Sequence, residues 1–193
     1  MLIRIANMLV LGYALSVWGI APAMAQAGAP RFDLKVQRAA GSDDAKAYQV
    51  TSSAMVDAPP AAVWRLLTDY DHLADYLPNL KSVRVVSRDG DTVILDQVGT
   101  ARFLFFSQSI RLRVLVQERA PDQIDISLID GDMKVFRASW KLSPLAGAAG
   151  TRLDYQASIV PKFDVPGVVG TSVVKKDIAR MMAAVLKRLE RQE

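Results

Sequence analysis

Apolar and polar residues alternate with a period of two along much of this chain, a pattern that is typical of half-buried β-strands. Near the N-terminal end, Phe32, Leu34 and Val36 alternate with polar residues. Short segments rich in Gly, Pro and Asp separate most of the later strands, so we expect antiparallel pairing through turns. The alternation predicts these further strands over residues 48–56, 83–87, 92–98, 103–118, 124–129, 135–142 and 152–160.

Two short segments between the second and third strands follow helical spacing instead. Residues 61–68 carry apolar side chains on one helical face, directly after a Pro-Pro pair, and proline is tolerated in the first turn of a helix. A second short helix is predicted over residues 71–76, with Asp69 or Asp71 as its N-cap.

The last segment, residues 166–191, predicts one long amphipathic helix. Its apolar stripe consists of Val174, Ile178, Met181, Val185 and Leu189. No strands remain to build a second sheet, so we expect this helix to cover one face of the sheet. A strongly curved sheet that holds one helix leaves a gap between the two, and in an apolar fold that gap is a ligand cavity.

Small residues cluster at the start of this helix, at Gly167, Gly170, Thr171 and Ser172. Glycine inside a helix costs about 1 kcal/mol relative to alanine, so its presence there needs a reason. One interpretation is that the small residues leave room for a ligand. The other is that they only form the loop before the helix.

The first 25 residues have the three-part layout of a secretory signal peptide. Arg4 supplies a positive charge, an apolar run follows over residues 8–20, and Ala23 and Ala25 are small residues suited to a cut after Ala25. The apolar run is short for a membrane span, although a retained N-terminal anchor is the alternative.

We therefore divide the chain into a signal peptide at residues 1–25, a leader and N-terminal strand at 26–46, and one domain at 47–193. The expected location is a bacterial periplasm, where cytosolic partners are absent. Export also argues against nucleic acid as a partner.

Composition narrows the chemistry that this domain can perform. The chain has no cysteine, which excludes disulfides and thiolate metal sites. His72 is the only histidine, so a His-rich metal site or a histidine-activated nucleophile is close to excluded. No phosphate-binding glycine loop or dinucleotide fingerprint is present, and we expect no metal and no cofactor. The net charge of +4 is compatible with anionic lipids or ligands.

Three stretches of the sequence carry a family resemblance. They are residues 56–70 (VDAPPAAVWRLLTDY), residues 76–80 (YLPNL), and the pair 130–136 (DGDMKVF) and 140–144 (WKLSP) continuing to 150–155 (GTRLDY). With them, the chain resembles the START-like superfamily, also called SRPBCC, and within it the polyketide cyclase/dehydrase and coenzyme-Q-binding branch. The resemblance covers about residues 48–189.

This resemblance implies an α+β helix-grip fold: a curved antiparallel sheet wrapped around a long C-terminal helix, with two short helices near the N-terminus and a hydrophobic tunnel between sheet and helix. It implies no fixed catalytic set, because this superfamily contains both carriers and enzymes on one scaffold. We accordingly assign no catalytic residue.

The leading hypothesis is an exported binding or transfer protein that holds a lipid, a fatty acyl chain or an isoprenoid quinone. Burial of each methylene group would contribute about 0.8 kcal/mol to binding. Aromatic residues on strands pack in a core more often than they line a pocket, and that alternative applies to most of the candidates. The candidate cavity-lining residues are Trp64, Tyr76, Leu95, Gln97, Phe105, Phe136, Trp140, Tyr155, Val169 and Val173.

Two other functions remain open. A cyclase- or aromatase-like enzyme acting on a polyketone would need a polar residue inside the cavity, and the candidates are Asp96, Gln97, Arg111 and Tyr155. Strand alternation instead favours the outer face of the sheet for Arg111 and for the other charged residues near it. The third possibility is an interaction module whose cavity has collapsed.

Basic residues on the long helix lie largely off its apolar stripe, at Lys175, Lys176, Arg180, Lys187 and Arg188. Such a face is usually only solvated. It could also make transient contact with an anionic membrane surface during ligand exchange. The sequence carries no signal for an oligomeric state.

Overall fold

The structure is a computed structural model that describes residues 31–40, 46–102, 107–146, 150–163, 165 and 169–191. This part of the chain contains eight strands, two short α-helices, one 3-10 turn and one long helix. The strands are β1 (Phe32–Ala40), β2 (Lys46–Val56), β3 (Leu80–Asp89), β4 (Thr92–Arg102), β5 (Ser107–Arg119), β6 (Gln123–Gly131), β7 (Met133–Pro144) and β8 (Thr151–Pro161). The helical segments are α1 (Pro60–Thr68), η1 (Tyr70–His72), α2 (Leu73–Tyr76) and α3 (Gly170–Glu190).

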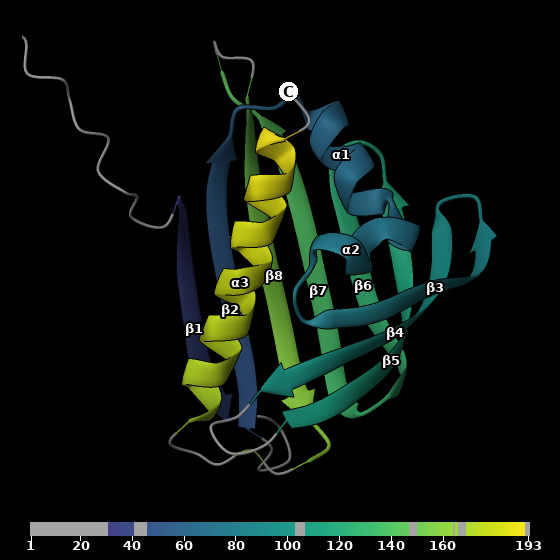
Figure 1. Cartoon of the computed structure of the whole chain (residues 1–193), viewed down its shortest axis with the longest axis vertical. Helices are drawn as coiled ribbons and strands as arrows, with labels where there is room; N and C mark the ends of the chain where they lie inside the picture. Colours follow the sequence, from purple (N-terminus) through teal and green to yellow (C-terminus); the bar gives the residue numbers. More distant parts are fainter. Residues whose placement is uncertain are drawn as a thin grey trace, which may run out of the picture.

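All eight strands belong to one antiparallel sheet with the order β1-β2-β8-β7-β6-β5-β4-β3. Strands β3 to β8 form a continuous meander, and β2 returns beside β8. Figure 1 shows α3 lying along β1, β2 and β8, with α1 and α2 beside it on the same side of the sheet. The predicted α+β helix-grip fold is confirmed, including the antiparallel pairing and the two short helices.

Most elements differ from the sequence predictions in their bounds: β3, for example, extends beyond the predicted residues 83–87, and the predicted helix 71–76 is divided into η1 and α2. Strand β5 begins at Ser107, and residues 103–106 of the predicted strand lie outside the described residues. Helix α3 begins at Gly170 with Val169 as its N-cap, and residues 166–168 also lie outside the described part. The predicted signal peptide and most of the predicted leader, residues 1–30, lie outside it as well.

The prediction that Asp69 or Asp71 caps the second short helix through its side chain was wrong. Asp69 does occupy the N-cap position of η1, but its side chain makes no capping hydrogen bond, and the following helix α2 has His72 at its N-cap position. The Asp69 carboxylate Oδ1 instead lies 2.8 Å from Nδ1 of His72. This hydrogen bond raises the pKa of His72, whose side chain is exposed.

The core forms between the inward-facing side chains of the sheet and the C-terminal half of α3. Period-two alternation directs Val93, Val114 and Leu153 inward, and each of them is fully buried. From the other side, Met182 and Val185 of α3 pack into the same cluster. The predicted stripe packs against the core through Ile178, Val185 and Leu189, whereas Met182 is buried in place of Met181, which is only partly buried.

A buried polar network fixes the η1 segment to the sheet. The Tyr70 hydroxyl donates a hydrogen bond to Glu118 Oε1 at 2.7 Å, and both terminal nitrogens of Arg88 donate to the same carboxylate at 3.1 Å. Glu118 is only 8% exposed, and the Arg88 guanidinium lies over the Tyr70 ring at 5.6 Å. Burial and the Glu118 carboxylate together raise the pKa of Tyr70, so the hydroxyl stays protonated as a donor.

Substitution Glu118→Ala should lower the free energy of unfolding by about 2–3 kcal/mol, because it leaves the buried Tyr70 hydroxyl without an acceptor. Urea denaturation measures this difference. Asp154→Ala is the matched control: it breaks the more exposed pair with Arg152 and should change stability by less than about 1 kcal/mol. Equal losses in the two variants would contradict a structural role for the network.

Candidate ligand cavity

A cavity of about 220 Å³ lies between the N-terminal half of α3 and the sheet, and it is partly open to solvent. Its wall on the sheet side includes apolar residues from three strands, such as Ile110 of β5, Met133 and Phe136 of β7, and Ile159 of β8. Phe163 and Val165, which precede α3, close another side. The gap predicted from the fold layout is therefore present.

One face of α3 forms the opposite wall. It consists of Gly170, Val173, Val174, Asp177 and Ile178. Their spacing of three, four, seven and eight residues places them on a single helical face. This face is continuous with the stripe that packs against the core further along the helix. One helical face therefore borders the cavity near the start of α3 and contacts the core towards its C-terminal end.

The space at Gly170 is taken up by a neighbouring side chain, which neither interpretation of the small residues anticipated. A Cβ atom at this position would collide with the hydroxyl oxygen of Tyr48 and approach Val165 Cγ1 at 2.8 Å. The glycine therefore admits the Tyr48 side chain against the start of α3, rather than simply leaving empty space. Gly167 lies outside the described residues, and Thr171 and Ser172 are not among the residues that line the cavity.

Three polar atoms in the cavity wall are buried without a hydrogen-bond partner among the described residues: Tyr48 Oη, Asn79 Oδ1 and Thr100 Oγ1. Tyr48 is 1% exposed and belongs to β2, whereas Thr100 belongs to β4. Most buried polar atoms in proteins are paired, so three unpaired ones around one cavity need an explanation.

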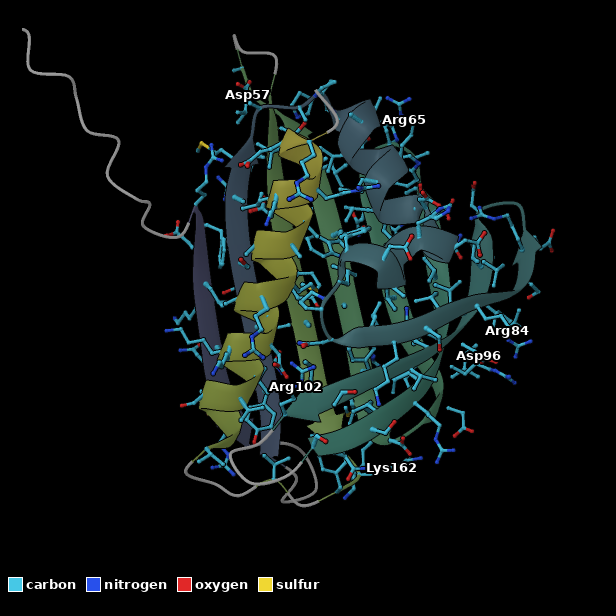
Figure 2. All side chains as sticks on the ribbon, in the orientation of Figure 1. Asp57, Arg65, Arg84, Asp96, Arg102 and Lys162 are labelled. Carbon is cyan, nitrogen blue, oxygen red and sulfur yellow. The ribbon has the colours of Figure 1, made fainter. Side chains whose placement is uncertain are left out.

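Asp177 is the one charged side chain in the described wall of the cavity. Burial raises the pKa of its carboxyl, while a hydrogen bond from the Asn79 side chain and nearby basic groups act in the opposite direction. Those basic groups are Arg180, whose Nη1 lies 3.6 Å from Asp177 Oδ1, and Arg102 and Lys176. Figure 2 shows Arg102 at the end of β4, beside α3.

The structure places two of the ten predicted cavity residues, Phe136 and Val173, in the wall of this cavity. Leu95, Trp140 and Tyr155 are buried in the core instead, where the rings of Trp140 and Tyr155 lie 4.5 Å apart. Ligand contact by any of these residues stays a prediction.

The other predicted residues lie elsewhere. Trp64 and Tyr76 are partly buried against the core, and the Tyr76 hydroxyl donates to the Leu66 carbonyl at 3.2 Å. Gln97 borders a separate depression on the sheet, and Val169 is the N-cap of α3. Phe105 lies outside the described residues.

The charged candidates for catalysis lie on the outer side of the sheet. Arg113 and Arg84 both donate hydrogen bonds to Asp96, at 2.7 Å and 2.5 Å, and these bonds lower the pKa of Asp96 to about 2. Figure 2 shows Arg84 and Asp96 together at the margin of the molecule, away from α3. The Arg111 side chain is 79% exposed, so the outward direction predicted from strand alternation is confirmed.

Sequence reasoning missed the four polar residues of the cavity: Tyr48, Asn79, Thr100 and Asp177. Asp177 did leave a signal, because it falls three residues after Val174 and four before Met181, on the apolar stripe of the last helix. The other three lie on separate segments of the chain, and no spacing rule connects them.

An antiparallel sheet that holds one helix over an apolar cavity defines the helix-grip class of ligand-binding domains. Within it, the chain belongs to the family described as polyketide cyclase / dehydrase and lipid transport, whose sequence profile matches residues 56–186. Membership of this START-like family implies binding of hydrophobic ligands or cyclase activity.

Solved structures share the fold at low sequence identity. A START superfamily protein from Mycobacterium smegmatis is 20% identical, with a TM-score of 0.66 over 75% of this chain and 99% of that one. The Zhui aromatase/cyclase from Streptomyces sp. R1128 is 15% identical, with a TM-score of 0.63 over 76% and 95%. A STAR-related lipid transfer protein from Xanthomonas axonopodis is 15% identical, with a TM-score of 0.59 over 80% and 98%. The search of curated proteins found no match to the chain.

Within the described ranges, no helix has the length and apolar character of a membrane span. No group of three or more histidine or acidic side chains there is arranged to hold a metal ion.

Substitution Asp177→Asn should stabilise the protein at pH 7. Because the pKa of Asp177 is raised in the fold, the folded state binds more protons than the unfolded state above the usual aspartate range near pH 4, so ionisation there costs stability. Thermal unfolding should give a higher Tm for the variant at pH 7, and the difference should shrink towards pH 4 and below.

Asp96→Asn is the matched control, because this substitution should change the Tm at pH 7 in the opposite direction. The pKa of Asp96 is lowered, so its contribution to stability is present above pH 4 and is lost as the pH falls towards about 2. We expect this variant to be less stable than the parent at pH 7. A Tm for Asp177→Asn at or below that of the parent at pH 7 would contradict the desolvation of Asp177.

Proposed function

We propose that this protein is an exported carrier that binds an apolar small molecule in the cavity between α3 and the sheet. The ligand class is a lipid, a fatty acyl chain or an isoprenoid quinone, the last in keeping with the resemblance to the coenzyme-Q-binding branch. The cavity itself carries the proposal: it is partly open, and aliphatic and aromatic side chains form most of its wall. Transfer of an apolar ligand from water into such a space is favourable in proportion to the apolar area buried.

The size of the cavity sets what it can hold. An apolar cavity of about 150 Å³ in a protein accommodates benzene, so 220 Å³ has room for a somewhat larger group. A ring system or part of an acyl or prenyl chain fits that volume. The remainder of a long ligand would leave through the open side.

The alternative function, a cyclase-like enzyme, has weaker support. Of its four candidate residues, Asp96 is held by arginines and Arg111 is exposed, both on the outer side, while Tyr155 packs in the core. Gln97 borders a different depression. Among the described residues of the wall, only Asp177 offers a carboxyl group to the cavity, and its basic neighbours lie outside the wall. A carrier needs no catalytic residue, so the geometry supports the carrier function better than the enzyme.

The basic side chains beside the cavity support transient docking on an anionic membrane surface. Lys175 and Lys176 are exposed and stand next to the cavity-facing residues Val174 and Asp177. Near an anionic bilayer, each such lysine contributes about 1 kcal/mol of attraction. Docking there would bring the cavity to the source of an apolar ligand.

Native mass spectrometry of the protein purified from the periplasm should show one bound apolar molecule. In Val173→Trp, an indole replaces an isopropyl group in the cavity wall, so both the bound molecule and the fluorescence of added N-phenyl-1-naphthylamine should be lost or weakened at least about tenfold. Ala183→Trp is the matched control, because Ala183 is exposed on the same helix away from the cavity, and it should behave like the parent. A parent protein that arrives empty and also fails to bind the probe would contradict the carrier function.

The same spectra test export. The mass of the periplasmic protein should correspond to a chain that begins at Gln26, because Ala23 and Ala25 suit signal peptidase cleavage after Ala25. A full-length mass in the membrane fraction would instead support the retained-anchor alternative.

A further inference from the structure

The sheet is open, and its two edge strands are built differently. Strands β1 and β3 stand at the ends of the strand order, so each has only one neighbouring strand among the described residues. The pairing of β3 with β4 contains two register shifts, one between Leu80 and Ser82 and one between Val85 and Ser87. Such bulges twist an edge and make it a poor template for a further strand.

Strand β1 lacks these protections. It pairs with β2 in an unbroken register from Phe32 to Ala40, and its nine residues include no proline and no glycine. Every second residue of such a strand directs its backbone N–H and C=O away from the neighbouring strand. The outer edge of β1 therefore presents a row of backbone donors and acceptors, and a long regular edge of this kind is suited to pairing with another strand.

We propose that the partner of this edge is a second copy of the chain, whose β1 pairs antiparallel with β1 about a two-fold axis at Leu34. In this register Leu34 faces the partner's Leu34. Phe32 faces the partner's Val36, and Asp33 faces the partner's Lys35, and the symmetry repeats both pairs on the other side of the axis. The two sheets then form one continuous sheet. This inference is independent of the proposed carrier function.

Charge selects this register. Asp33 and Lys35 are exposed, and on β2 they face Ser53 and Thr51 rather than an opposite charge. In the proposed pairing each Asp33 lies opposite a lysine, so the dimer gains two cross-strand ion pairs. The two nearest registers that keep the faces aligned would place Asp33 opposite the partner's Asp33, or Lys35 opposite the partner's Lys35. Like charges directly opposite each other are destabilising.

Apolar side chains support the same pairing on the inner face. Phe32, Leu34 and Val36 pack against the core, but each remains partly exposed. In the dimer their exposed parts contact the same three residues of the partner subunit, which buries further apolar surface. Figure 1 shows α3 crossing the sheet obliquely, with its C-terminal end farther from β1 than its N-terminal end. The helix therefore leans away from the first half of β1, the part of the edge that pairs.

Pairing through β1 produces a closed assembly. Both copies use the same strand, so the free edges of the joined sheet are the two β3 strands, whose bulges oppose further pairing. We therefore expect a dimer rather than a growing polymer. No residue of β1 is among the described residues that line the cavity, so the dimer leaves the wall of the cavity unchanged.

Sedimentation velocity measurements on the protein purified from the periplasm test the assembly. The paired segment spans only residues 32–36, so the dimer should be weak, with a Kd on the order of 10 µM. The sedimenting species should change from monomer to dimer as the protein concentration rises from about 1 µM to about 500 µM. A monomer over this whole range, or a series of larger oligomers, would overturn the inference.

Charge reversal locates the interface. Lys35→Asp places aspartates opposite each other on both sides of the axis, so it should raise the Kd at least about tenfold. The double variant Asp33→Lys/Lys35→Asp restores opposite charges and should regain most of the affinity. Lys81→Asp is the matched control, because it makes the same charge change at an exposed position of β3, the other edge strand, and it should leave the Kd unchanged. Failure of the double variant to recover, or an equal loss in the control, would overturn the inference.

Introduced thiols read the register directly, because the chain has no cysteine of its own. Facing Cα atoms of an antiparallel pair lie about 4.5–5.5 Å apart, which is within the range of a disulfide. Mild oxidation should therefore convert Leu34→Cys to a covalent dimer. Gln37→Cys is the matched control: the position is exposed on the same strand, but the register separates its two copies by about 20 Å. Cross-linking of Gln37→Cys as efficient as that of Leu34→Cys would overturn the proposed register.

Discussion

Helices alone have to cover the apolar face of an eight-stranded sheet, and this constraint governs the rest of the structure. No second sheet in the described part of the chain shares the task, so the stripe on α3 covers the sheet together with the segment α1–η1–α2 beside it (Figure 1). The stripe is fully apolar from Ile178 to Leu189, and there the helix packs closely into the core. Towards its N-terminal end the same stripe includes Gly170 and Asp177, and there a cavity separates helix from sheet. One helical face therefore provides both the stability of the fold and the candidate binding site.

Two sets of buried polar side chains in the described residues differ in whether their hydrogen bonds are made. In the Tyr70–Glu118–Arg88 network, the carboxylate of Glu118 accepts hydrogen bonds from both partners, and the network joins η1 to β3 and β5. Around the cavity, Tyr48 and Thr100 have buried oxygens with no partner in the described residues. A satisfied network contributes to stability, whereas an unsatisfied one reduces it. The second group therefore lowers the stability of the fold beside the cavity.

Family membership leaves both ligand binding and cyclase activity open, and the residues of the cavity narrow this choice further. The fold is shared with an aromatase/cyclase and with a lipid transfer protein, each at 15% identity to this chain. At that identity the likeness concerns the fold alone, because one scaffold supports many chemistries. The cavity, in contrast, is defined by the side chains that this sequence places in its wall. They include one carboxyl group and three unpaired polar atoms, against a wall that is otherwise largely apolar.

The sequence by itself determined the elements, their antiparallel pairing, the covering role of the last helix and the outward direction of Arg111, because periodicity and turn composition are local properties. The sequence also places Asp177, a charged residue, on the apolar stripe of the last helix, although Asp177 is not among the predicted site residues. Only the tertiary structure decided which residues meet at the cavity. Tyr48 and Thr100 lie far apart in the chain and come together because β2 and β4 both pass beside α3, while Trp140 and Tyr155 turn into the core instead. The curvature of the sheet and the position of the helix determine which distant residues lie together. Both depend on packing among many residues at once rather than on any local pattern.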